Sequence, residues 1–106
     1  MTRAKIPRVR LDPQVIAVCI QRAGLLRGPM IAEFIAEWAI CAEDLGHEPT
    51  TTEFAAWWKD SSERTAWRRI SRFREAFPEV GEDGTPGDLA RAEYRELVAA
   101  RPTPAR

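Results

Sequence analysis

The sequence predicts an all-α protein, a small bundle of about five helices that contains a helix-turn-helix and has no β-wing. Three observations support this class. Apolar residues recur at the three- and four-residue spacing of helices. Capping residues, glycines and prolines mark where these segments begin and end. No segment alternates apolar and polar residues as a half-buried strand does. With 106 residues, the chain can form one domain with its own core.

The first two helices are predicted from their start and stop signals. Asp12 and Pro13 are an N-cap and a first-turn proline, so a helix begins there. Gly24 is expected to end it. The second helix covers about 29–45 and ends at Gly46. It is the most apolar of the set and forms the centre of the predicted core, including Trp38.

Two capping boxes predict the next pair of helices. The first box, Thr50 to Glu53, begins a short third helix. The second, Asp60 to Glu63, begins a fourth helix at once, over about 61–77. Such a short link does not suit a long antiparallel hairpin, but it suits the sharp crossing of a helix-turn-helix.

A last helix is predicted over about 86–100. The link before it, EVGEDGTPGD, does not contain the two strands of a wing. The expected organisation is a basic flexible arm (1–11), one helical domain (12–100) with the helix-turn-helix at about 50–77, and a frayed tail (101–106). The residues of the last helix expected to be available for burial are Leu89, Tyr94, Leu97 and Val98.

The net charge is zero, but the charges are sorted along the chain. Residues 1–28 carry six basic side chains and one acidic one, and residues 57–77 carry six basic and three acidic ones. Residues 29–56 carry six acidic side chains and no basic one. The folded molecule should therefore present local fields of both signs.

The period of the fourth helix separates two faces. Arg64, Arg68 and Arg72 recur every four residues and form one stripe, which spans about 12 Å. Trp67 lies at its edge. This stripe can reach phosphates and base edges in a major groove. The residues expected to be buried are Ala66, Ile70, Phe73 and Phe77. The candidate DNA contacts are Ser62, Arg64, Trp67, Arg68, Arg69, Ser71 and Arg72.

The expected partner is double-stranded DNA. A basic arm can add contacts along the backbone or minor groove, or can remain unbound. A homodimer would add affinity, with either the last helix or the first two as its contact. The candidate arm contacts are Arg3, Lys5, Arg8 and Arg10.

The stretch around EFAAWW, SERTAWRR and FREAFP resembles small helix-turn-helix DNA-binding proteins of actinobacteria and their phages. The resemblance covers about 50–78. It implies a DNA-binding transcriptional regulator whose reading helix includes 62–72. One departure concerns the turn, where a glycine and an apolar residue are usual and this chain has Lys59 and Asp60.

A protein-interaction module is the alternative function, for example an antitoxin- or inhibitor-like adaptor. Exposed Trp57 or Trp67 would then anchor the partner, since Trp and Arg dominate binding hot spots. The two functions differ in salt dependence, because contacts with phosphates release counterions.

Catalysis is not expected. Cys19 and Cys41 lie in apolar helical patterns, and His47 lies in a polar link. No spacing indicates a nucleophile–base pair, a metal site or a phosphate loop, so no cofactor, metal or small-molecule substrate is predicted. The sequence contains no apolar run of membrane-spanning length, and we expect a cytoplasmic protein without a membrane partner.

Overall fold

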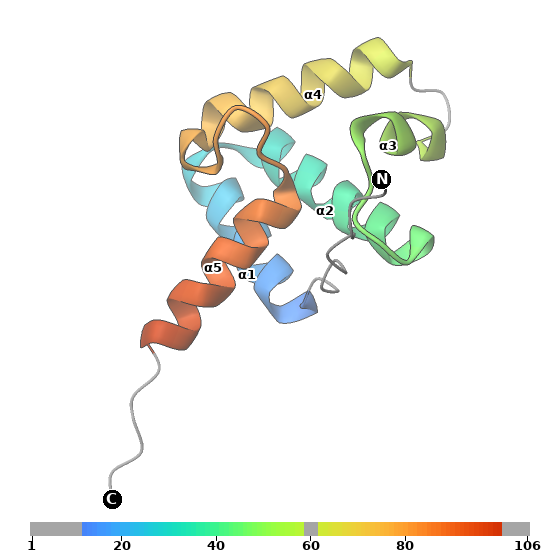
Figure 1. The fold of residues 1–106 in the computed structure, drawn as a ribbon. Helices are drawn as coiled ribbons and strands as arrows, with labels where there is room; N and C mark the ends of the chain where they lie inside the picture. Colours follow the sequence, from blue (N-terminus) through green and yellow to red (C-terminus); the bar gives the residue numbers. More distant parts are fainter. Residues whose placement is uncertain (1–11, 59–61, 101–106) are drawn as a thin grey trace, which may run out of the picture.

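The computed structural model describes residues 12–58 and 62–100 (Figure 1). Over these ranges no strand occurs, so the predicted all-helical class is confirmed and no wing follows the fourth helix there. No helix in the described parts of the chain has both the length and the apolar character needed to cross a membrane. The helices are α1 (Pro13–Leu26), α2 (Pro29–Leu45), α3 (Thr51–Trp57), α4 (Glu63–Ala76) and α5 (Pro86–Ala100), with a short 3-10 turn, η1 (Pro78–Val80), after α4.

The predicted start of α1 is confirmed, but its predicted end at Gly24 is wrong. The Asp12 side chain accepts a hydrogen bond from Gln14 N (2.8 Å), as an N-cap does. The helix then continues past Gly24 to Leu26, because the left-handed residue that interrupts the chain is Gly28, at φ 108°. Gly24 therefore lies inside a helical turn.

The boundaries of α2 and the start of α3 agree with the prediction. Gly46 ends α2 in the left-handed conformation at φ 80°, which glycine adopts without a Cβ penalty. Thr50 and Glu53 form both hydrogen bonds of the capping box, at 2.9 and 3.1 Å.

The predicted cap of α4 is wrong by two residues. Its N-cap is Ser62, whose hydroxyl accepts from Thr65 N (3.1 Å). Asp60, the expected cap, lies outside the described residues. Both residue types cap helices well, and here the later one begins the helix. The helix ends at Ala76, one residue before the predicted end at Phe77, which is its C-cap.

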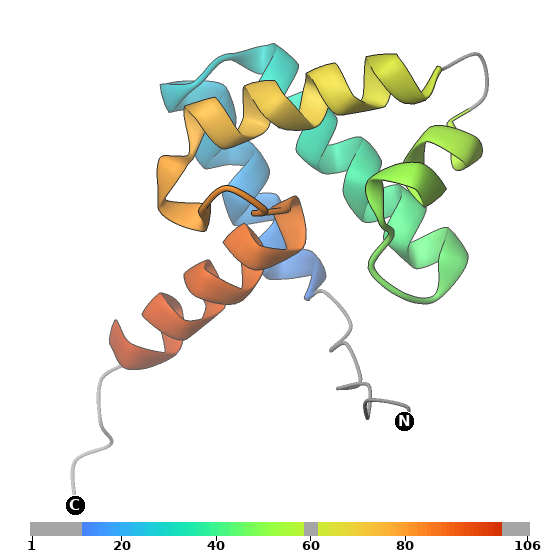
Figure 2. The ribbon, with the colours of Figure 1, turned by 45° about the horizontal axis from the view of Figure 1, so that its top comes forward.

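The core takes buried side chains from all five α-helices, and its aromatic part lies where α2, α3 and α4 meet. α4 crosses over α2, and α5 packs on α1 (Figures 1 and 2). Trp38 is fully buried, as predicted. Its ring centroid lies 5.7 Å from that of Phe34 and 5.2 Å from that of Phe54. Phe73 adds the contribution of α4, 5.8 Å from Phe34. Aromatic pairs at such distances hold the three helices together.

The second half of α5 contradicts one predicted set of buried residues. Leu89 is buried, as expected, but Tyr94, Leu97 and Val98 are exposed by 44–50%. The reason is visible in Figure 1, where the end of α5 extends away from the other helices. These side chains share a face of the helix, but this part of α5 lies beyond the other helices, so no helix in the described parts of the chain covers the face.

Candidate nucleic-acid interface

The inner face of α4 anchors it to the core. The predicted buried stripe is confirmed without exception, since Ala66, Ile70, Phe73 and Phe77 each have no solvent exposure. On α3, Phe54 and Ala55 are also buried. Ala55 and Ala66 are small buried residues on α3 and α4, and these two helices pack against each other. The opposite face of α4 therefore points towards solvent.

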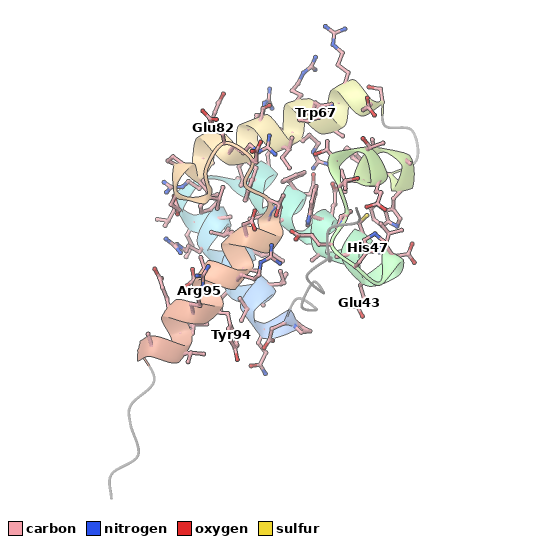
Figure 3. All side chains as sticks on the ribbon, in the orientation of Figure 1. Glu43, His47, Trp67, Glu82, Tyr94 and Arg95 are labelled. Carbon is pink, nitrogen blue, oxygen red and sulfur yellow. The ribbon has the colours of Figure 1, made fainter. Side chains whose placement is uncertain are left out.

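The outer face of α4 carries the predicted arginine stripe. Arg64, Arg68 and Arg72 are all exposed. Within residues 12–58 and 62–100, no ion pair or hydrogen bond joins their side chains to another group. Figure 3 shows long side chains that project from this face of α4 away from the domain. These cations are therefore available to a partner.

The polar and aromatic candidates on α4 have different surroundings. Ser62 is exposed, but its hydroxyl already caps the helix and lies 3.0 Å from Thr65 Oγ1. Ser71 is exposed one turn after Arg68. Trp67 is 47% exposed, at the edge of the outer face (Figure 3). A large, half-exposed indole is a strong contact for any partner.

Arg69, a predicted DNA contact outside the stripe, has its partners inside the domain. Its guanidinium forms an ion pair with Glu37 and lies 3.8 Å from Glu33 on α2. It also stacks 4.1 Å above the Trp58 ring, at the end of α3. Because successive helix residues are about 100° apart, Arg69 points to the side of α4 that faces α2 and α3. It joins three helices and is not free for DNA.

Other arginines have internal partners as well. Arg74 donates from Nε to the Gly84 carbonyl (2.9 Å), and Arg22 pairs with Glu93. Arg27 lies over the Phe77 ring at 5.1 Å. Arg95 on α5 is exposed and has no ion pair with the described residues. The cluster of arginines in the sequence thus separates into structural cations and a free stripe.

The two neighbouring tryptophans, Trp57 and Trp58, differ in the groups that they contact. Both are partly buried. Trp57 stacks on Phe54 and donates from Nε1 to Asp44 (2.8 Å). Trp58 lies under Arg69. Trp57 is therefore held by α2, and it is a weaker candidate than Trp67 for contact with a partner.

A buried carboxylate in the α2–α3 link was missed from the sequence. Glu48 lies in the stretch GHEPT, and its side chain is only 1% exposed. It accepts from Thr85 Oγ1 (2.6 Å) and from Arg91 (3.0 Å), at the start of α5. Asp88 shares Arg91 at 2.7 Å. We call these four side chains the Glu48 cluster. The charge of Glu48 in a polar stretch was the only sequence signal, and it does not distinguish burial from exposure.

The Glu48 cluster and the α3 cap shift two pKa values. Burial alone would lower the pKa of Arg91, but its hydrogen bond to Asp88 and the charge of Glu48 outweigh this and raise it. The pKa of Glu53 is lowered, chiefly by its hydrogen bond to the Thr50 backbone and then by that to His47. His47 is exposed and lies 3.0 Å from Glu53, so it is a loop residue as predicted.

Both cysteines are reduced and buried, as predicted. Burial, and to a smaller extent nearby carboxylates, raises the pKa of each thiol to about 11. A thiol that stays protonated at neutral pH is a poor nucleophile. In the described residues, no group of three or more His, Cys, Asp or Glu side chains is placed to hold a metal ion.

The predicted arm contacts lie outside the described residues, as does the tail at 101–106. Comparison with known proteins found no relative of this chain. No protein-family model, no curated protein and no solved structure matches the chain.

Proposed function

We propose that the chain is a sequence-specific DNA-binding protein, a small transcriptional regulator in which α3 and α4 form a helix-turn-helix and α4 enters the major groove. The observation that carries this proposal is the stripe of Arg64, Arg68 and Arg72, exposed and without ion pairs among the described residues. The stripe spans about 12 Å along the helix, which is close to the width of the groove.

The placement of Arg69 supports the proposal indirectly. The acidic side chains of α2 would repel a phosphate backbone if they were unpaired. Arg69 binds Glu37 and approaches Glu33, so part of this charge is neutralised inside the domain. Asp44 is engaged by Trp57. The field over the outer face of α4 is then determined mainly by its own arginines.

The remaining negative charge limits where DNA can lie. Glu75 is exposed in the last turn of α4, and Glu82 and Asp83 are exposed in the loop after it. Carboxylates oppose contact with phosphates. We therefore place the DNA against the first three turns of α4, where the stripe begins.

Self-association through α5 is part of the proposal. A single reading helix buries too little surface for tight specific binding, and dimers contact two half-sites. The half-exposed apolar residues Tyr94, Leu97 and Val98 make α5 one possible contact. The first two helices offer another, since Leu25 and Met30 are exposed by 78% and 66%. Sedimentation should show a dimer for the wild type and a monomer for Leu97→Glu. A wild type that remains monomeric at high concentration would refute this contact.

A protein-interaction module remains the second candidate function, and the observation that favours it is the 47% exposure of Trp67 beside free arginines. A contact centred on this indole would depend little on salt. A contact with phosphates would weaken steeply as salt rises. Neither candidate needs catalysis, and the protonated thiols and the loop position of His47 support a non-enzymatic role.

The test compares Arg72→Ala with Arg95→Ala in binding to a random-sequence duplex at low salt. Both variants remove one exposed arginine, so their net charges are equal. We expect Arg72→Ala to weaken binding by about fivefold, or ~1 kcal/mol, and Arg95→Ala to bind as the wild type does. Equal affinities for the wild type and Arg72→Ala would show that the outer face of α4 does not contact DNA.

A further inference from the structure

The outer face of α4 has a centre and two flanks, and these assign different tasks to its arginines. The buried stripe gives the direction of the core. With about 100° between successive residues, Arg68 points almost directly away from that stripe. Arg64 and Arg72 point about 40° to either side of Arg68 and lie one turn before and after it.

A helix in the major groove meets two kinds of surface. Its outermost line faces the base edges on the floor of the groove, and its flanks face the phosphates along the walls. On this geometry Arg68 reaches base edges, and Arg64 and Arg72 reach phosphates. The exposed Ser71, about 60° from the line of Arg68, faces a wall as well.

The charges along α4 favour the same assignment. The neighbours of Arg68 at three and four residues are Arg64, Thr65, Ser71 and Arg72, and none is acidic. Arg72, in contrast, has Glu75 three residues later, at a spacing where oppositely charged side chains attract each other. Unlike Arg72, Arg68 therefore has no acidic neighbour within α4 that competes for its guanidinium.

The remaining arginines of α4 do not compete for the centre. Arg69 is held by Glu37 and the Trp58 ring, and Arg74 by the Gly84 carbonyl. Trp67 points about 100° from Arg68, so its indole lies on one side of the contact and not at its middle.

We infer that Arg68 is the residue that determines specificity, and that it selects a guanine in the target site. A guanidinium matches the O6 and N7 acceptors of guanine, which no other base presents as a pair in the major groove. Arg64 and Arg72 position the helix through phosphates and add affinity for any sequence. This inference rests on the proposed function, because it assigns roles within the same interface.

The experiment selects bound duplexes from a random-sequence pool with the wild type, Arg68→Ala, Arg64→Ala and Arg72→Ala. Circular dichroism first verifies that each variant is folded. We expect the wild-type pool to contain a position fixed as guanine, which Arg68→Ala loses. Arg64→Ala and Arg72→Ala should select the same sequence with weaker affinity. If Arg68→Ala retains that guanine, or if Arg64→Ala alone loses it, the assignment is wrong.

A second measurement tests the contact at the level of atoms. Replacing the selected guanine by 7-deazaguanine removes the N7 acceptor. The wild type should then bind about tenfold more weakly, and Arg68→Ala should not distinguish the two duplexes. An equal loss in both proteins would assign the guanine contact to another residue. A wild type that binds duplex DNA but selects no sequence refutes only the inference, whereas one that binds no duplex DNA refutes the proposed function too.

Discussion

Gly87 in the first turn of α5 should not tolerate a side chain, because Glu48 occupies the space. A Cβ built on Gly87 would lie 1.7 Å from Glu48 Oε2 and 2.2 Å from its Cδ. Glu48 cannot simply swing into water, since its side chain is 1% exposed and is held by Thr85 and Arg91. Gly87→Ala must therefore displace a buried carboxylate from its hydrogen bonds.

The expected cost follows from opposing terms. Losing hydrogen bonds to a charged group costs about 1.5–3 kcal/mol. Replacing glycine by alanine inside a helix stabilises by up to about 1 kcal/mol. We expect Gly87→Ala to destabilise by about 2 kcal/mol, which corresponds to a fall in Tm of roughly 8–16 °C for a domain of this size.

Making Gly87→Ala in a Glu48→Ala variant distinguishes the clash with Glu48 from a general effect of alanine at position 87. In Glu48→Ala the carboxylate is absent, so Gly87→Ala should become neutral or stabilising by up to about 1 kcal/mol. Urea unfolding of the wild type, both single variants and the double variant measures the coupling. If Gly87→Ala lowers stability equally in both backgrounds, Glu48 is not the obstacle. The outcome matters for the interface, because α3 begins three residues after Glu48.

Three further predictions concern the helix junctions and the thiols. Arg69→Ala should destabilise the domain by about 1–2 kcal/mol in urea unfolding, because the variant loses the ion pair with Glu37 and the stacking on the Trp58 ring. The control variant Arg68→Ala should stay within about 0.5 kcal/mol of the wild type. Thr50→Ala should cost about 1 kcal/mol by removing the α3 cap, and a Thr50→Ser variant should restore it. Burial raises the pKa of Cys19 and Cys41 to about 11 from the ordinary 9.0, so the thiols' contribution to stability is complete below pH 9 and is lost as pH rises towards 11. Urea melts at pH 8 and pH 10 should show this fall, and alanine at both cysteines should reduce it; an unchanged fall would assign it to other groups.

Much of the fold could be predicted because local signals coincide with the element boundaries. Pro29 and Gly46 bracket α2 on either side, and the structure places its ends there. The buried stripe of α4 follows from the helical period alone, and all its members are buried. The start of α4 was harder to predict from the sequence, since Asp60 and Ser62 are both good N-cap residues. Only the folded structure shows that Ser62 is the N-cap.

The errors share a physical cause, which is that a period identifies the residues of one face but not what lies opposite. Arg69 was grouped with its neighbours because its ring and carboxylate partners come from other helices. Tyr94, Leu97 and Val98 share a face of α5, yet that helix leaves the body of the domain before reaching them. Glu48 was assigned to a polar link because its partners lie in α5, far along the chain.

The salt dependence of binding to DNA tests the central claim most directly. The measurement is fluorescence anisotropy of a labelled random-sequence duplex, titrated with the wild-type protein over a series of salt concentrations. If Arg64 and Arg72 both contact phosphates, the log of the binding constant should fall against the log of salt with a slope of about −2. No binding at the lowest salt, or a slope near zero, would contradict a DNA-binding function for this chain.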